Sequence, residues 1–167
     1  MPVGGDFGTV ALEIGDGSVS VLAESSFGSF GYHWSRTGAD PVAFLRRISF
    51  DYAMMKFRGR DYEVYDRSGQ ERELKSQVLA ARRSKGLSAE EAREQFDDVV
   101  SVCEASTVNE FKSNMYHSSL LAALYDNDCS AVDAKLVYDP QCVGFWDAIW
   151  VPLMAHLGKV PQAALAA

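Results

Sequence analysis

A β-hairpin is encoded near the start of the chain by residues 9–21, which read TVALEIGDGSVSV. Positions 10, 12 and 14 are apolar and alternate with small or polar residues, which is the period-two pattern of a strand with one buried face. Gly15-Asp16-Gly17 supplies residues that tolerate the positive φ angles of a tight turn, and the alternation resumes at Val19 and Val21. Residues 8–24 are therefore predicted to form two antiparallel strands.

A third strand is predicted just after the hairpin. The aromatic residues Phe30, Tyr32 and Trp34 fall on one face of this strand, while Gly31 and His33 fall on the other. The segment 8–36 thus predicts a small antiparallel sheet of about three strands, with an aromatic face suited to a core.

The first helix is predicted to start at Asp40-Pro41. An N-cap residue followed by proline at the first helical position is a common helix start, because the missing N–H of proline costs nothing there. We expect one helix that ends near Gly59, with an apolar face made of Phe44, Ile48, Tyr52 and Met55. Residues 61–66 fit either an extended segment or a loop.

Later helix starts are marked by capping boxes, in which two side chains satisfy free backbone N–H groups. Three helices are predicted from these starts. The first ends at Gly86, the second extends through Cys103, and the third ends at Asp126. The boxes are Ser68-x-x-Glu71, Ser88-x-x-Glu91 and Thr107-x-x-Glu110. Residues 131–138 fit a short helix or a connector. Asp139-Pro140 begins a final helix, which Pro152 is expected to kink.

The order of strands followed by helices predicts the α+β class, with four to five helices packed on one face of the N-terminal sheet. A length of 167 residues suits one domain, and no Gly- or Pro-rich linker divides the chain. We expect a single domain over 1–167, with the sheet at 8–36, a helical part at 40–158 and a peripheral tail at 159–167.

The charge distribution argues against direct nucleic-acid binding, since the formal net charge is −7. Residues 36–86 hold twelve Lys and Arg against seven Asp and Glu, and the rest of the chain holds four against sixteen. The first six residues lack the basic and apolar character of a signal peptide, and apolar runs are short, so no membrane segment is expected. These features predict a cytoplasmic protein.

Catalytic and metal-binding signatures are weak. The histidines, at 33, 117 and 156, are far apart in sequence, so neither a metal site nor a cofactor is expected. Asp126-x-Asp128-x-Ser130 begins like a calcium loop, but Ala131 and Val137 stand where the loop needs glycine and glutamate. The cysteines at 103, 129 and 142 are expected to be free, buried thiols. An enzyme is therefore not favoured.

Several surface groups are candidates for binding, each with a structural alternative. His33, with Ser35 and Arg36, fits an anion site on the outer face of the sheet, or is an ordinary surface histidine. Trp34 fits an aromatic anchor together with Trp146 and Trp150, or a core stripe. The remaining candidates are Arg47 and Arg58, with Lys56, as a site for a phosphate or an acidic partner, and the acidic set Glu90, Glu94, Asp97 and Asp98.

One resemblance covers most of the chain. The segment Phe27–Trp34, followed by Phe44-Leu45, Asp51-Tyr52 and Lys56-Phe57, resembles a pattern in small bacteriophage proteins of unassigned role. Leu87–Arg93 and Phe145-Trp146-x-x-x-Trp150-x-Pro152 resemble the same group. The resemblance implies an accessory protein that acts in the cytoplasm of a host bacterium, and it implies no catalytic residue.

Two hypotheses follow. The first is an interaction protein that binds and modulates or inhibits a host bacterial protein or complex through an acidic surface, such as an anti-defence inhibitor of a restriction or CRISPR system. The second is a small enzyme, or a nucleotide- or anion-binding protein, with a site on the sheet face around His33. The oligomeric state is left open, with a homodimer as one option.

Overall fold

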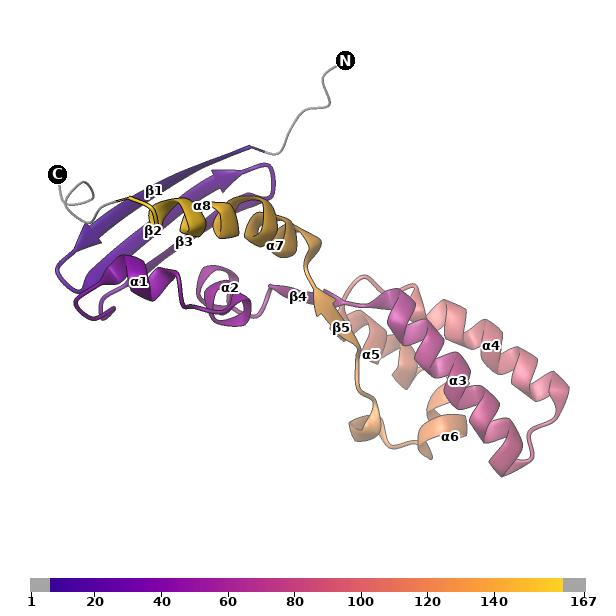
Figure 1. The fold of residues 1–167 in the computed structure, drawn as a ribbon. Coiled ribbons are helices and arrows are strands. Elements are labelled where there is room, and N and C mark those ends of the chain that lie inside the picture. The colour runs from indigo at the N-terminus through magenta and orange to yellow at the C-terminus, as the bar shows by residue number, and fades with distance from the viewer. Residues whose placement is uncertain (1–6, 161–167) are drawn as a thin grey trace, which may run out of the picture. The chain divides into compact units, whose positions relative to one another are not determined.

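The N-terminal strands form one antiparallel sheet in this computed structural model, which describes residues 7–160. Strands β1 (Gly8–Gly15), β2 (Ser18–Ser25) and β3 (Gly28–Trp34) lie in the order β1-β2-β3, and Figure 1 shows them side by side. The predicted hairpin and third strand are confirmed. Residues 1–6, for which no signal sequence is predicted, lie outside the described residues. Most of the predicted peripheral tail also lies outside them.

The register of the sheet sorts its side chains into rows. The rows Ile14–Val19–Trp34, Leu12–Val21–Tyr32 and Val10–Ala23–Phe30 run across the strands on one face. The middle strand is buried at all its positions in these rows, so this face is the inner one. The opposite face carries Glu13–Ser20–His33 and is open to solvent. Alternation in the sequence thus becomes one apolar and one polar face.

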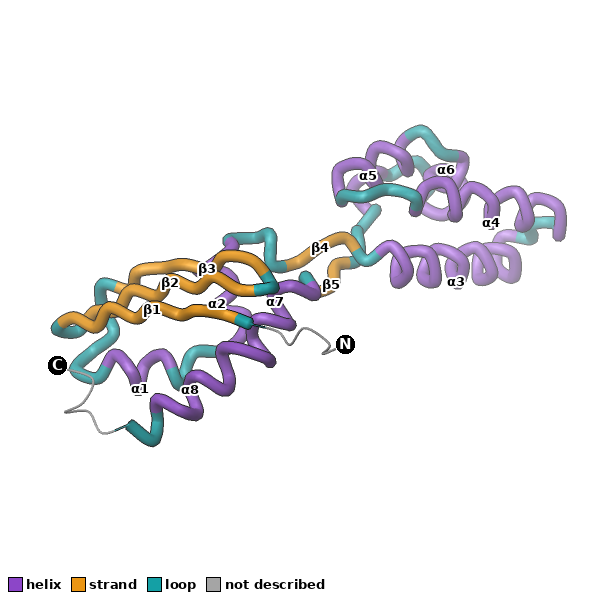
Figure 2. The backbone as a smooth tube through the Cα atoms, turned by 90° about the horizontal axis from the view of Figure 1, so that it is seen from above, coloured by secondary structure: helices purple, strands orange, loops and turns teal. Residues whose placement is uncertain are grey.

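Helices from both ends of the chain cover the inner face of the sheet. They are α1 (Pro41–Leu45), α2 (Phe50–Arg58), α7 (Pro140–Phe145) and α8 (Val151–Leu157), with a π-helical turn at Trp146–Trp150. Their buried residues join the sheet in one hydrophobic cluster. Figure 2 shows α1 and α8 on one side of the strand layer. Strands and helices therefore confirm the α+β class.

The single helix predicted over residues 40–59 is wrong. Asp40 caps α1 as expected, by accepting a hydrogen bond from the backbone N–H of Ala43, but α1 ends after five residues. Ser49 then caps α2, and Gly59 ends it. The break rotates the second segment, so Ala53 and Met54 are buried and Tyr52 and Met55 are exposed.

The helix near the C-terminus is irregular just before Pro152, whereas the kink predicted at this proline stays a prediction. The π-helical turn 146–150 directly precedes α8, in which Pro152 is near the first position. Proline has no N–H to donate to the preceding turn, so wider i to i+5 spacing is tolerated there. Trp150, at the end of this turn, is buried in the cluster on the sheet.

The middle of the chain builds a second hydrophobic cluster. It begins with β4 (Glu63–Tyr65) and α3 (Arg67–Lys85), and continues with α4 (Ala89–Cys103), α5 (Val108–Tyr116) and α6 (Ser119–Tyr125). A 3-10 turn at Cys129–Ala131 and strand β5 (Leu136–Tyr138) follow, and β5 pairs with β4. The core contains Leu74, Val99 and Phe111, and it is separate from the sheet cluster.

Two of the three predicted capping boxes differ in detail. The box at Ser88 and Glu91 is confirmed in full. Asp66, not Ser68, caps α3, so Ser68 lies inside the helix. Thr107 caps α5 as expected, but Glu110 accepts from the N–H of Ser106 instead of that of the cap residue.

The predicted helix up to Asp126 is two helices, because Ser118 caps a new one. Ser118 accepts a hydrogen bond from the backbone N–H of Leu120, and α6 continues to Tyr125. Asp126 then adopts the left-handed conformation that ends α6, as the sequence indicated. Residues 131–138 form a connector that ends in β5.

The described chain divides into two compact units, which are residues 7–62 with 138–160, and residues 63–137. The second unit is an insertion between α2 and α7 of the first. The expectation that the chain folds as a single domain stays a prediction.

Of the cysteines, Cys103 and Cys142 are buried and Cys129 is exposed, which corrects the expectation for Cys129. No helix within residues 7–160 has the length and apolarity needed to cross a bilayer.

The contact between Phe30 and Phe145 yields a stability prediction. Their rings stack with centroids 4.0 Å apart, and Phe145 is fully buried. We expect Phe145→Ala to lower the free energy of unfolding by about 3–5 kcal/mol, since it removes a large core side chain and leaves a cavity. Denaturant unfolding measures the loss. Leu22→Ala, on the open face, is the control and should cost under about 0.5 kcal/mol. Equal losses would contradict this packing.

Candidate functional site

Helix α4 carries most of the predicted acidic residues on one exposed face. Its buried side consists of Ala92, Val99, Val102 and Cys103, and its capping box fixes where the helix begins. Glu90, Glu94 and Asp97 recur at spacings of four and three, so they share the solvent side. Within residues 89–103 there are five Asp and Glu against one Arg.

The carboxylates of this acidic face form no ion pair among the described side chains. None of Glu90, Glu94 and Asp97 forms an ion pair with a described side chain, and all are exposed. Glu91, in the capping box, accepts hydrogen bonds from Ser88, and these lower the pKa of its carboxyl group. The acidic face therefore presents a cluster of acidic side chains that can attract a basic partner.

Asp98 differs from the other acidic candidates because it is half-buried and hydrogen-bonded. It accepts a hydrogen bond from the Ser119 hydroxyl at 2.6 Å and a longer one from the Ser118 hydroxyl at 3.4 Å. Gln95 donates to Ser119 at 2.9 Å. These contacts attach the start of α6 to α4. Asp98 therefore holds α6 in place in addition to being an acidic residue of α4.

A polar hollow lies beside the acidic face. It has a volume of about 350 Å³ and is lined by Asp98, Ser101, Val102, Asn114, His117, Ser118 and Ser119. The Asn114 amide donates to the Val102 carbonyl at 3.3 Å, which ties α5 to α4 at the hollow. The acidic face and the hollow together offer charge and hydrogen-bonding groups to a partner.

His33 lies on the open face of the sheet, as predicted. Its Nδ1 is 2.9 Å from the Ser20 hydroxyl, and Glu13 occupies the next place in the same cross-strand row. A hollow of about 390 Å³ covers this row and also includes Leu22, Gly31 and Tyr32. Ser35 and Arg36 follow the end of β3 and are exposed. Sequence reasoning missed Ser20 and Glu13, which only strand pairing places beside His33.

This row does not reproduce the geometry of a catalytic triad. In a triad the acid orients the histidine and the histidine activates the serine. Here Ser20 stands between Glu13 and His33, so the acid neighbours the serine instead. The arrangement provides hydrogen-bonding groups for a ligand without the charge relay order of a hydrolase.

Trp34 lies inside the core, where 4% of its surface is exposed. Its ring makes edge contacts with Tyr32, Phe44 and Phe57, and its Nε1 has no hydrogen-bond partner within residues 7–160. Trp150 is also buried and stacks with Trp146. The aromatic stripe is therefore part of the core, which was the structural alternative.

The basic candidates each have a separate contact. Arg47 donates to the Ala43 carbonyl at 3.1 Å. Arg58 is 3.9 Å from the Asp139 carboxylate and lies over the Phe30 ring. Lys56 lies over the rings of Tyr32 and Tyr52. The structure does not bring these side chains to a common point by any contact among the described residues.

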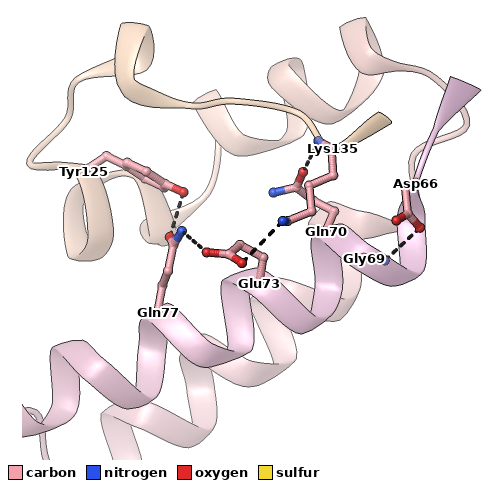
Figure 3. Close-up of polar contacts among 7 residues, drawn as sticks. All are labelled: Asp66, Gly69, Gln70, Glu73, Gln77, Tyr125 and Lys135. Atoms are coloured by element: carbon pink, nitrogen blue, oxygen red, sulfur yellow. Dashed lines mark hydrogen bonds and ion pairs between the residues drawn. The ribbon is translucent and has the colours of Figure 1, made fainter. Parts of the chain in front are cut away.

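A polar network on α3 was not predicted. The Tyr125 hydroxyl donates to the side-chain Oε1 of Gln77 at 2.7 Å, and the Gln77 side-chain amide donates to Glu73 at 3.2 Å (Figure 3). The Lys135 ammonium is 3.5 Å from the other oxygen of Glu73. Gln70 completes the set one turn earlier on the helix. The spacing of 70, 73 and 77 was the available signal, since it places three polar residues on one helix face.

The network changes two pKa values. The hydrogen bond from Gln77, followed by Lys135, lowers the pKa of the Glu73 carboxyl group. Burial raises the pKa of the Tyr125 hydroxyl, although its hydrogen bond with Gln77 acts in the opposite direction. Glu73 is therefore charged and Tyr125 neutral at physiological pH.

No three His, Cys, Asp or Glu side chains in the part of the chain from 7 to 160 come together as a metal site would require.

Comparison with known proteins gives one result. A family model described as "Phage family" matches residues 3–157. No curated protein and no solved structure gives a significant match.

The lowered pKa of Glu73 generates a testable pH effect. Because the folded-state pKa lies below the unfolded-state value, the contribution of Glu73 to stability is present above the unfolded pKa and lost as pH falls through the folded pKa. Nuclear magnetic resonance titration should place its midpoint below 4.5. Gln77→Leu should raise that midpoint and leave Glu91, whose shift comes from Ser88, unchanged. An unmoved Glu73 midpoint would contradict the network.

Proposed function

Since the chain belongs to the phage protein family Phage_phiTE_072, we propose that it is an accessory protein that binds a host bacterial protein through the acidic face of α4. The acidic face is defined here as Glu90, Glu94 and Asp97. The observation that carries the proposal is the exposure of these three carboxylates on one side of a helix whose other side is buried, with no ion pair to a described side chain.

A basic surface on the partner fits this chemistry. Complementary charge steers association and fixes orientation, and its contribution falls as salt rises. The hollow at Asn114 and His117 adds further hydrogen-bond donors and acceptors on the same helix pair. Such a contact has a charged part, which sets the association rate, and a hydrogen-bonded part, which holds the register.

A host protein that handles nucleic acid is the class of partner that we favour. Its groove is basic because it accepts phosphates, and an acidic helix face can occupy the same groove. Blocking that groove would inhibit a defence complex in the host cytoplasm. Direct binding of nucleic acid by this chain is disfavoured by its net charge of −7.

Charge neutralisation tests the proposal. The tagged protein is used to isolate partners from a bacterial lysate at low and moderate salt, with mass spectrometry of the bound fraction. We expect one host complex in stoichiometric amount, weakened by salt. Its affinity should fall about tenfold or more in a variant without the acidic face, since several charge contacts are lost. The substitutions are Glu90→Gln, Glu94→Gln and Asp97→Asn.

A second variant controls for the change in net charge. It removes three exposed carboxylates from elsewhere in the chain, by Asp61→Asn, Glu63→Gln and Asp147→Asn. This control should bind like the unmodified protein. If both variants bind equally well, the acidic face has no role, and if no host protein is retained at either salt concentration, the interaction proposal is wrong.

The second candidate function is ligand binding on the open face of the sheet. The Ser20–His33 hydrogen bond, with Glu13 in the same row beneath a hollow, favours a small polar ligand there. A thermal-shift screen with nucleotides, inorganic phosphate and divalent metals tests it. Binding should raise Tm, and His33→Ala should abolish the rise. Unchanged melting across the panel would count against this candidate.

A further inference from the structure

A second polar hollow lies along α3, away from the residues of the acidic face. Its volume is about 250 Å³, and its lining includes Gln70, Glu73, Gln77, Tyr125, Asp133 and Lys135. A hollow of this size is smaller than the pockets that hold drug-sized molecules, so a small metabolite fits it better. Every one of these residues belongs to the unit 63–137.

Gln70 is the buried member of this hollow, with 2% of its surface exposed. The backbone N–H of Lys135 donates to its Oε1 at 2.7 Å (Figure 3). That contact fixes the orientation of the amide, because only the oxygen can accept from an N–H. The Nε2 group is thereby turned away from the Lys135 backbone and toward the hollow that Gln70 lines.

The Nε2 group of Gln70 makes no hydrogen bond with another described residue, and solvent in the hollow can reach it. A solvent-accessible donor of this kind is hydrated in the free protein, and a ligand can accept from it in place of water. Two other donors of the lining are engaged, because the Tyr125 hydroxyl donates to Gln77 and one N–H of the Gln77 amide donates to Glu73. The hollow therefore presents the oriented Gln70 donor near the Lys135 ammonium.

The charges of the lining favour a cationic group near Asp133 and Tyr125, which lie in the same hollow as Gln70. Glu73 and Asp133 are carboxylates and Lys135 is the ammonium that faces Glu73, so the lining carries one net negative charge. Asp133 is exposed and has no ion pair with a described side chain. The Tyr125 oxygen, whose proton is directed at Gln77, is a further acceptor.

We propose that this hollow binds a free basic amino acid. The carboxylate of the ligand accepts from the Gln70 amide and the Lys135 ammonium. Its cationic side chain donates to Asp133 and to the Tyr125 oxygen. A ligand with one net positive charge balances the lining, which a simple anion or a neutral sugar does not. This inference does not depend on binding of a host protein.

The test uses the full chain with L-arginine and L-lysine as probes. Binding is measured by isothermal titration calorimetry and by nuclear magnetic resonance of the side-chain amide signals. We expect saturable binding that shifts the Gln70 amide signals. Agmatine, which lacks the carboxylate, should bind at least about tenfold more weakly than L-arginine, since one charge-assisted set of hydrogen bonds is lost. Glycine, which lacks the second cationic group, should also be weaker.

Asp133→Asn tests the cationic end with little risk to folding, because Asp133 is exposed. It should weaken L-arginine binding about tenfold, and Asp61→Asn is the matched control that should leave it unchanged. The variant without the acidic face should also bind the amino acid normally, which separates this site from the proposed host interface. Gln70 signals that stay unmoved by both amino acids, or agmatine binding as tightly as L-arginine, would overturn the proposal.

Discussion

The packing of Phe145 on Phe30 is the contact on which the architecture depends. It joins a helix near the C-terminus to the third strand of the N-terminal sheet, with ring centroids 4.0 Å apart. The sheet has one apolar face, and a strand layer with an uncovered apolar face is not stable alone. The two ends of the chain must therefore meet, and everything between Tyr62 and Tyr138 is looped out as an insertion.

The insertion has a core of its own, and this has a functional consequence. Leu74, Val99 and Phe111 are fully buried within it, so its helices obtain their stability from one another. The acidic side of α4 takes no part in either hydrophobic cluster. Its residues are free from packing constraints, which is the condition under which a helix face can carry charge for a partner at little cost in stability.

Local signals in the sequence predicted local structure well. Strand alternation, the cap at Ser88 and the stop at Asp126 each depend on neighbouring residues, and each is confirmed. The predicted long helices failed where a serine inside them could start a new helix, as Ser49 and Ser118 do. Competing caps are decided by which apolar side must be buried, and that information is not local. The insertion was missed because β4 and β5, which pair with each other, replace a flexible linker.

The candidate sites divide in the same way. The acidic face was visible in the sequence because helical spacing alone brings Glu90, Glu94 and Asp97 together. The environment of His33 required the strand register, and the orientation of Gln70 depends on a backbone N–H that lies 65 residues away. A side chain whose partner is a distant backbone group leaves no pattern in composition or periodicity. Binding groups held by tertiary contacts are therefore found only in the folded chain, whereas charge on one helix can be predicted before folding is known.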